Sequence, residues 1–142
     1  PNAKAVYLGM TLRHDKRHMI RSTMEGIVYS MKESYAIFRS LGIKGDRIIA
    51  AGGGAKSPLF RQIQADMYDC PIYTNQGKEQ ASIGAAMTAA VGSGYFKDYE
   101  EACGQMVHLS PEVTEPIPEN VKLYEEEFLR FKEIYFANKA LF

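Results

Sequence analysis

RIIAAGGGAKSPLFRQIQADMYDC, residues 47–70, joins an apolar run, three consecutive glycines and an amphipathic segment. The run at residues 48–51 is typical of a buried strand. Ser57 is a favourable helix N-cap, because its hydroxyl can accept a hydrogen bond from a backbone N–H of the first turn, and Pro58 suits the first helical position. A strand, a glycine turn and a capped helix together bring bare backbone and the positive end of a helix close to a ligand. The ligand at such a place is most often a nucleotide or another anion.

The composition is that of a globular protein with one domain. The chain has 142 residues, enough to bury a core, and 46% of them are hydrophobic. The formal net charge of +0 gives no reason to expect a nucleic acid or an anionic membrane as partner. No apolar run approaches the ~20 residues of a membrane-spanning helix, and no signal peptide is recognisable. Cys70 and Cys103 lie far apart in the sequence and predict reduced thiols in a cytoplasmic protein.

The hydrophobic periodicity predicts strands that alternate with helices. Strands are expected at residues 6–11, 48–51 and 71–74, and helices at 15–42, 57–69, 79–94, 98–105 and from 119 or 120 onward. This order indicates a layered α/β domain with parallel strand pairing. Three short strands make a small sheet with an open edge. Together with a start at Pro1 instead of Met, this predicts a piece of a longer protein that lacks its first strands.

Two features predict close approach between helices and their neighbours. The helix expected at residues 79–94 consists mostly of small residues, so it should pack very close to another element. Gly26 lies inside the long helix at a cost of about 1 kcal/mol relative to alanine, which close approach of another backbone would explain.

The glycine turn at residues 52–54 does not match the two best-known phosphate-binding motifs. Ala50 and Ala55 stand where a P-loop has glycines. In a dinucleotide-binding fingerprint, Ser57 would replace the third glycine, and Ile72 would stand near the position of the acidic residue. A tight turn without any ligand remains an alternative, because glycine turns are common in loops.

No complete catalytic or metal site is evident. His14 and His18, four residues apart, could place two ligands on one metal ion, but no third ligand is apparent, and a polar face shared with neighbouring basic residues is the simpler interpretation. The acidic side chains of Glu25, Asp66 and Asp69 fit structural roles better than that of a general base. The sequence therefore predicts part of an active site, without catalytic or metal-binding residues of its own.

Three segments carry a resemblance to a known family. GGGAKSPLFRQIQAD, residues 52–66, resembles the adenosine-binding motif of the FGGY carbohydrate kinases. EQASIGAAMTAAVGSG, residues 79–94, is similar to the small-residue helix that follows in those kinases, and residues 9–30 resemble their long helix with its Glu25–Gly26 pair. Within the family, the tail with its prolines and its final aromatic helix is most similar to xylulose kinases.

The resemblance implies a two-domain sugar kinase of the actin/Hsp70 superfamily, with ATP bound between ribonuclease-H-like domains. Residues 1–142 would be the C-terminal part of the second domain, with an α/β core at 1–94 and a helical tail at 95–142. The parent reaction would convert ATP and a pentulose such as xylulose into ADP and a sugar phosphate. Glycerol, gluconate or ribulose are alternative substrates, and a non-catalytic nucleotide-binding module is an alternative function.

The resemblance also implies which residues contact the nucleotide. Gly53, Gly54 and Ala55 would line the adenosine, with Ser57 near the edge of the base. The catalytic aspartate, the phosphate-binding loops, most of the sugar pocket and the main Mg²⁺ ligands would lie outside this chain. We therefore expect the chain alone to be inactive, and its open sheet edge predicts self-association.

Overall fold

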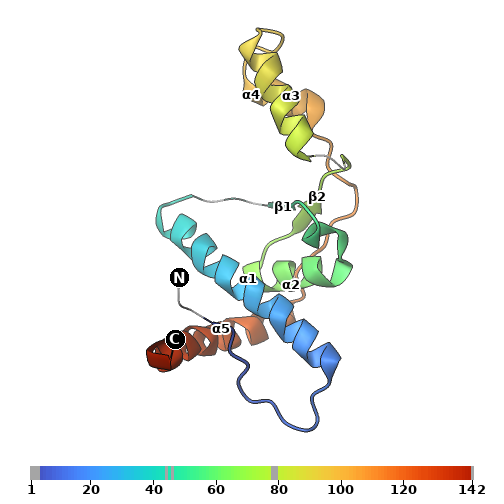
Figure 1. Ribbon diagram of the computed structural model, residues 1–142. Coiled ribbons are helices and arrows are strands. Elements are labelled where there is room, and N and C mark those ends of the chain that lie inside the picture. The colour runs from blue at the N-terminus through green and yellow to red at the C-terminus, as the bar shows by residue number, and fades with distance from the viewer. Residues whose placement is uncertain (1–3, 44, 46, 78–79, 142) are drawn as a thin grey trace.

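The computed structural model describes residues 4–43, 45, 47–77 and 80–141. Its elements, in chain order, are α1 (Lys16–Ser40), β1 (Ile48–Ala50), the 3₁₀ turn η1 (Gly54–Lys56), α2 (Pro58–Tyr68), β2 (Ile72–Thr74), α3 (Gln80–Gly92), α4 (Tyr99–Met106), α5 (Pro118–Asn138) and the 3₁₀ turn η2 (Lys139–Leu141). Helices α1, α2 and α5 form one body with the two strands, and α3 and α4 extend from it as a separate helical hairpin (Figure 1).

The two strands pair in parallel, as the alternating pattern predicts. Ile48 lies opposite Ile72 and Ala50 opposite Thr74. The chain returns from α4 along the other side of β2, where Ile72 and Thr114 form an antiparallel bridge. Because the strands are parallel, the loops that follow β1 and β2 leave the sheet at the same edge.

The strand expected at residues 6–11 is a wrong prediction, because no strand forms there. Residues 4–10 lie along α1 and α5 and are exposed, with a hydrogen bond of 2.7 Å between the hydroxyls of Tyr7 and Thr23. A strand requires a neighbouring backbone that supplies its hydrogen bonds. Among the described residues, β1 pairs on one side only, with β2, but residues 4–10 lie against α1 and α5 and do not reach the free edge of β1.

The helix ends follow the local sequence signals closely. Asp15 caps α1 in a capping box with His18, and α1 ends two residues before Gly42, as expected. The Phe60 N–H donates to the Ser57 hydroxyl at 3.3 Å at the start of α2. Helix α5 begins at Pro118, one residue before the earliest predicted start, because proline itself takes the first position.

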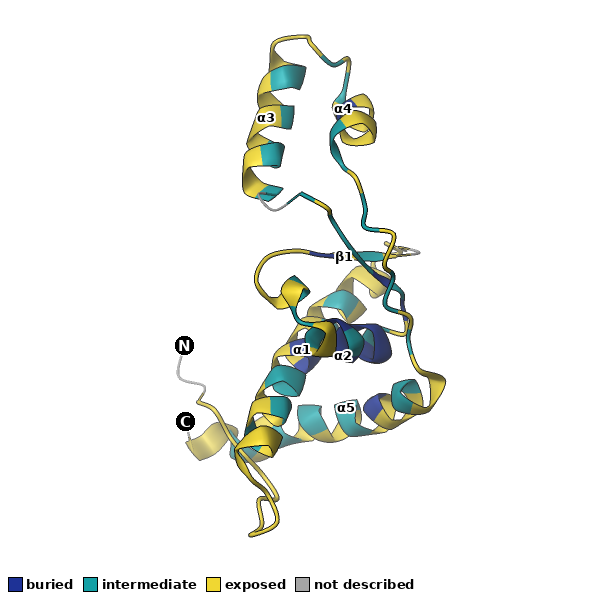
Figure 2. Ribbon diagram, turned by 90° about the vertical axis from the view of Figure 1, so that its right-hand side faces the viewer, coloured by how far each residue is buried: buried dark blue, intermediate teal, exposed yellow. Residues whose placement is uncertain are grey.

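Helix α2 is the centre of the core. One cluster of buried residues joins it to α1 and α5 and consists of Val28, Tyr29, Ile63, Met67 and Tyr124. A second cluster joins it to the sheet and consists of Ala50, Ala65 and Ile72. Figure 2 shows most of the buried positions on α2 and on the faces of the elements around it. The segment that follows the glycine turn is therefore the best-packed helix of the chain.

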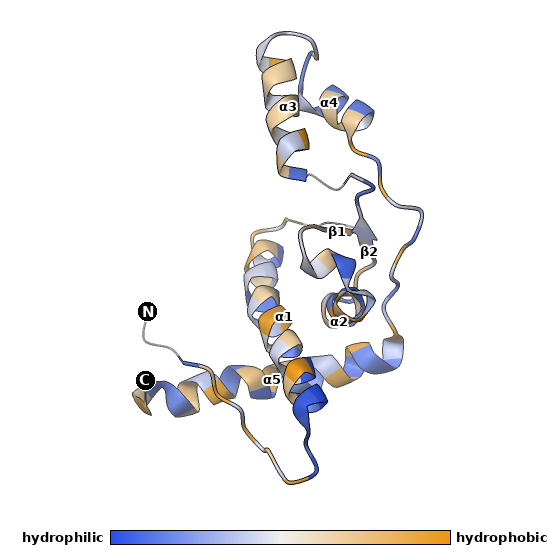
Figure 3. Cartoon of the chain, turned by 45° about the vertical axis from the view of Figure 1, so that its right-hand side comes forward, coloured by the Kyte–Doolittle hydropathy of each residue, from blue (hydrophilic) through white to orange (hydrophobic). Residues whose placement is uncertain are grey.

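Of the two expectations of close packing, the one for α3 is met only against α4, and the one for Gly26 is wrong within the described residues. Helix α3 contains no buried residue, although it is mostly apolar, and it contacts α4 on one side only (Figure 3). Its predicted start at Glu79 lies outside the described residues. A Cβ added at Gly26 would have no atom within 4 Å among its neighbours. Across the described ranges, no helix has both the length and the apolar character needed to cross a bilayer.

Candidate functional site

The turn at residues 52–57 lies at the carboxyl end of β1, where parallel α/β sheets commonly bind ligands. Gly52 has a φ of 75°, a conformation that favours glycine. The Lys56 N–H donates to the Gly53 carbonyl at 3.2 Å, and the Ser57 N–H donates to the Gly54 carbonyl at 3.1 Å. The turn is therefore a short 3₁₀ helix that leads directly into α2.

The two glycines expected to line a ligand differ in their surroundings. Gly53 is exposed, has φ of −63° and ψ of −39°, and has open space where a Cβ would lie. At Gly54, an added Cβ would lie 2.8 Å from the ring of Phe60. Gly54 is thus required by packing within the chain, whereas the space at Gly53 is free for a ligand.

Ala55 and Ser57 are half-buried parts of the same turn, and Lys56 between them is exposed. The methyl group of Ala55 packs against the cluster between α2 and the sheet. The Ser57 hydroxyl oxygen accepts the capping hydrogen bond of α2, which leaves its O–H able to donate to another group. The structure therefore brings all four predicted residues together on one exposed turn.

Arg61 is a residue that the sequence reasoning missed. From the first turns of α2, its Nη1 donates to the Ala55 carbonyl at 2.7 Å and its Nη2 to Glu112 at 3.1 Å, and its Nε lies 3.4 Å from the Thr114 hydroxyl. Only 10% of its side chain is exposed. Two of its three partners lie more than 50 residues later in the chain, so local spacing gives no signal for this contact.

Asp66 has the structural role expected from the sequence. It is 1% exposed and accepts hydrogen bonds of 2.8 Å from the Gln62 side chain, the Ile117 backbone N–H and the Asn120 side chain. These bonds hold the start of α5 against α2. Because its oxygens are occupied by these donors, Asp66 is not placed to act as a base.

Glu25 is likewise structural, as expected. It accepts from Arg21 Nε at 2.6 Å and from the Tyr124 hydroxyl at 2.7 Å, and Arg21 Nη2 donates to the same hydroxyl at 2.6 Å. Burial is the main reason that the pKa of Tyr124 rises to about 12; the bond to Glu25 adds to the rise and the Arg21 guanidinium opposes it. This triad connects α1 to α5.

Of the two histidines near the start of α1, His18 belongs to the helix cap and His14 to the turn before it. His18 Nδ1 lies 2.8 Å from Asp15 Oδ1, and the Thr11 N–H donates to His14 Nδ1 at 2.9 Å. The Arg17 guanidinium, followed by His18, holds the pKa of Asp15 well below its usual range. No group of three or more His, Cys, Asp or Glu side chains that could hold a metal ion occurs among the described residues.

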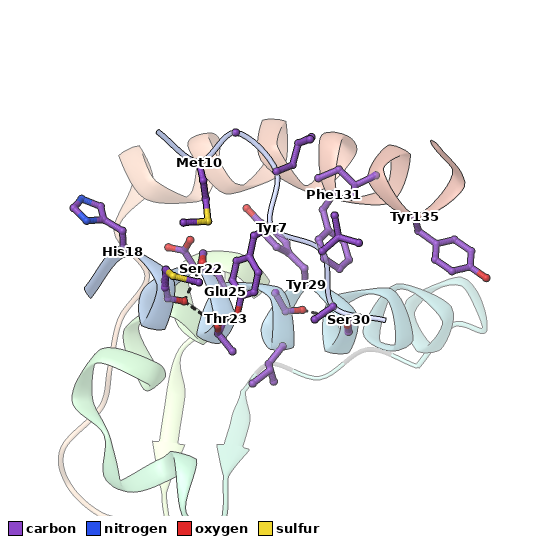
Figure 4. Close-up of a pocket in the computed structure, with 18 of the residues that line it drawn as sticks. Tyr7, Met10, His18, Ser22, Thr23, Glu25, Tyr29, Ser30, Phe131 and Tyr135 are labelled. Carbon is purple, nitrogen blue, oxygen red and sulfur yellow. Dashed lines mark hydrogen bonds between the residues drawn. The ribbon is translucent and has the colours of Figure 1, made fainter. Parts of the chain in front are cut away.

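A groove of about 590 Å³ lies between the N-terminal segment, α1 and α5 (Figure 4). Its lining is mostly apolar and includes Met10, Tyr29 and Phe131, while Tyr7 reaches across it to Thr23. The turn at residues 52–57 does not line this groove. The turn, which carries the sequence motif, is the candidate site.

Comparison with known proteins shows that the chain is similar to carbohydrate kinases. Residues 1–93 match the C-terminal domain of the FGGY family of carbohydrate kinases. The chain is 35% identical to a xylulose kinase of Bacillus subtilis (strain 168) over 134 residues, which is 94% of this chain and 27% of that protein. It is 37% identical to a xylulose kinase of Staphylococcus epidermidis (strain ATCC 12228) over 135 residues, 95% of this chain and 27% of that protein. The chain thus spans about a quarter of the length of the curated relatives that it matches.

Solved structures support the same architecture. A xylulose kinase from Rhodospirillum rubrum matches with a TM-score of 0.85 at 23% identity, over 99% of this chain and 28% of that chain. This likeness shows the fold alone. A gluconate kinase from Lactobacillus acidophilus matches with a TM-score of 0.83 at 28% identity, over 96% of this chain and 27% of that chain. The mixed helix and sheet architecture is consistent with the expected actin/Hsp70-like fold.

Proposed function

The chain belongs to the FGGY family of carbohydrate kinases, and we propose that it is the ATP-binding C-terminal part of a kinase that phosphorylates a pentulose such as xylulose. The parent protein would transfer the γ-phosphoryl group of ATP to a sugar hydroxyl and release ADP. The two relatives at 35% and 37% identity are xylulose kinases, which supports a pentulose as substrate. Gluconate is the second candidate, because a gluconate kinase is among the structural neighbours.

The observation that carries the nucleotide proposal is the free space at Gly53. The residue is exposed, and a side chain added there would meet no atom of the protein within 4 Å. In our proposal the flat adenine and its ribose lie against the backbone of Gly53, Gly54 and Ala55, with Ser57 near the edge of the base. A Cβ at Gly53 would keep the base away from this surface.

We place the chemistry of the reaction in other parts of the kinase. Phosphoryl transfer depends on positioned phosphates, on Mg²⁺ and on a group that orients the attacking hydroxyl. The described residues contain no cluster of acidic side chains fit to hold Mg²⁺. In our proposal, as the family resemblance implies, the metal ion and most of the sugar are bound outside residues 1–142. Within this chain, residues 1–94 form the α/β core and 95–142 the helical tail.

We further propose that the isolated chain acts as an incomplete unit. It should not phosphorylate a sugar, because in our proposal the catalytic aspartate implied by the family resemblance lies in another part of the kinase. It should also self-associate, because α3 and the N-terminal segment expose apolar side chains such as Leu8, which is 73% exposed. We expect the whole kinase to act in the cytoplasm.

Gly53→Val tests the nucleotide proposal cleanly. The backbone of Gly53 is in the right-handed helical region, which valine can adopt, and the added side chain meets open space, so the fold should be retained. When ADP is titrated into the wild-type chain, we expect chemical-shift changes in the NMR signals of residues 52–57. In Gly53→Val these changes should disappear.

A matched control is Gly104→Val in α4, where an added Cβ also meets no atom within 4 Å. This variant should bind ADP like the wild type. Equal shifts in Gly53→Val and the wild type would remove the turn from the nucleotide site. A coupled assay with a panel of pentuloses and gluconate, run on the 142-residue chain, checks the proposed lack of activity, and turnover of any of these sugars would overturn it.

A further inference from the structure

We propose that Arg61 is a positioning residue for the nucleotide turn, which it fixes to the sheet through the Ala55 carbonyl. This inference rests on the proposed function, because it concerns the geometry of the same turn. Arg61 does not face the open space at Gly53, and its role is to hold the backbone that does.

The burial of Arg61 is the first step of the argument. A buried cation is unfavourable unless it is paired and its N–H groups are hydrogen-bonded. Arg61 has one carboxylate partner, Glu112, whose own side chain is 73% exposed, and two neutral acceptors, the Ala55 carbonyl and the Thr114 hydroxyl. The guanidinium can be buried because its N–H groups, which are held in a rigid planar fork, each find one of these acceptors.

The second step concerns the backbone of the turn. The carbonyls of Gly53 and Gly54 accept from the N–H groups of Lys56 and Ser57, and the Ala55 carbonyl accepts from Arg61. All three carbonyls are thus bonded within the chain, so the orientation of each peptide plane in the turn is fixed. Arg61 supplies the only one of these bonds that comes from a side chain.

The third step connects the turn to the edge of the sheet at which the loops after β1 and β2 leave. Thr114 exchanges two backbone hydrogen bonds of 3.0 Å with Ile72 in β2, so the segment that holds Arg61 is itself an extension of the sheet. The same segment holds the loop after β2, since the Gln76 N–H donates to the His108 carbonyl at 2.9 Å. Arg61 therefore positions the loop after β1 against the segment that also positions the loop after β2.

The distinguishing variants are Arg61→Lys and Asn120→Ala. A lysine at position 61 keeps the charge and can reach one acceptor, but it has no fork to bridge two segments. Asn120→Ala removes one hydrogen bond to Asp66. Asp66 is, like Arg61, a buried residue of α2, but it does not contact the turn. Both variants should lower stability, but only Arg61→Lys should alter the turn.

The experiment measures ADP affinity by NMR titration, the stability of each variant in urea, and amide hydrogen exchange at Lys56 and Ser57 without ligand. We expect Arg61→Lys to weaken ADP binding about fivefold, the effect of one lost hydrogen bond, and to speed exchange at both amides. Asn120→Ala should leave affinity and exchange at the turn unchanged. If the two variants weaken binding in proportion to their lost stability, Arg61 is a structural residue only and the inference is wrong.

Two further variants keep the test decisive if Arg61→Lys does not fold. Glu112→Gln and Thr114→Val each weaken one arm of the Arg61 contact while the arginine stays in place. Each should weaken ADP binding about twofold, and unchanged affinity in both would overturn the inference. If the wild-type chain shows no ADP-dependent shifts, the proposed function itself fails, an outcome that is seen before any Arg61 variant is compared.

Discussion

Helices α2 and α3 each follow a parallel strand through a glycine-containing loop, yet they differ in almost every contact. Six residues of α2 are buried, including Arg61 and Asp66, whereas α3 has none. Three polar side chains of α2, those of Arg61, Gln62 and Asp66, are bonded to segments more than 50 residues later in the chain. Helix α3 consists mostly of alanine and other small residues, and among the described elements it packs mainly on α4.

The difference shows that strand, loop and helix signals define an element without defining its surroundings. A helix that is apolar on all sides normally lies inside a core. Helix α3 follows β2, and the curated relatives are about three and a half times as long as this chain. In the kinase that we propose, we therefore expect further protein surface to cover α3. Helix α2, in contrast, already buries six of its residues against elements of this chain.

The largest expected effect is that of Asp66→Ala at the α2 junction. The substitution removes Asp66 as acceptor for three partly buried donors, from Gln62, Ile117 and Asn120, of which only the Gln62 amide keeps a second acceptor, the Glu115 carbonyl. An unsatisfied buried polar group costs ~1–3 kcal/mol, so the free energy of unfolding should fall by about 3 kcal/mol or more. Urea denaturation followed by circular dichroism measures this loss.

The same substitution in the hairpin is the control. Asp98 caps α4 and accepts one hydrogen bond, from the Glu101 N–H at 2.9 Å. Asp98→Ala should cost only ~1 kcal/mol, the usual value of an N-cap. Equal losses for the two variants would contradict the view that α2, and not the hairpin, organises the chain.

Sequence reasoning was most successful where the signals are local. The capped start of α2 at Ser57–Pro58, the start of α1 after Asp15 and the parallel pairing were all predictable, because caps and alternation act within a few residues. The strand expected at residues 6–11 failed because strand formation depends on a partner that the local sequence does not contain. That α3 contains no buried residue was likewise not predictable, because burial depends on which elements lie around the helix.

The candidate site shows the same division. The turn residues from Gly53 to Ser57 lie together as the motif predicts, because they are neighbours in the chain. The contact of Arg61 with Glu112 and Thr114 was not predictable, because no periodic pattern connects residues that lie more than 50 positions apart. Long-range polar contacts of buried side chains become visible only in the folded chain.

Tyr124→Phe tests the second polar connection of the core, between α1 and α5. The substitution removes the hydroxyl that donates to Glu25 and accepts from Arg21. Because hydrogen bonds to charged groups contribute ~1.5–3 kcal/mol, we expect a loss of about 2 kcal/mol in urea denaturation. Tyr99→Phe, at an exposed position of the hairpin, should leave stability unchanged.

The pH dependence of stability checks the same contact. Tyr124 has its pKa raised to about 12 in the folded chain, so the folded state keeps this proton while the unfolded state, with its ordinary pKa of ~10, loses it. Its contribution is fully present below pH ~10 and is lost as the pH rises towards 12. Tyr124→Phe should lose less stability than the wild type over this range, and parallel curves would contradict the assignment.

On the hairpin, Ala85→Lys tests whether the exposed surface of α3 causes self-association. Lysine has a helix propensity close to that of alanine, so the helix should be retained. The charge should weaken self-association about tenfold, equivalent to ~1.4 kcal/mol, in sedimentation velocity over a dilution series. Ala137→Lys, at an exposed position of α5, is the matched control and should have no effect. A wild-type chain that sediments as a monomer at every concentration would contradict the prediction.

The smallest expected effect comes from the residues that end the two helices. The chain leaves α2 through Asp69, which has a φ of 49°, and it leaves α3 through Gly94, which has a φ of 76°. This left-handed conformation is unfavourable for residues with a Cβ and free for glycine. Asp69→Gly should therefore stabilise the chain by about 0.5 kcal/mol, because the relief exceeds the greater freedom of glycine in the unfolded state. The reverse change, Gly94→Asp, should destabilise it by a similar ~0.5–1 kcal/mol. A lower free energy of unfolding for Asp69→Gly would contradict this prediction. It would mean that the attraction between the Asp69 carboxylate and the Lys32 ammonium contributes more than the strained backbone costs, so that charge as well as packing holds the end of α2.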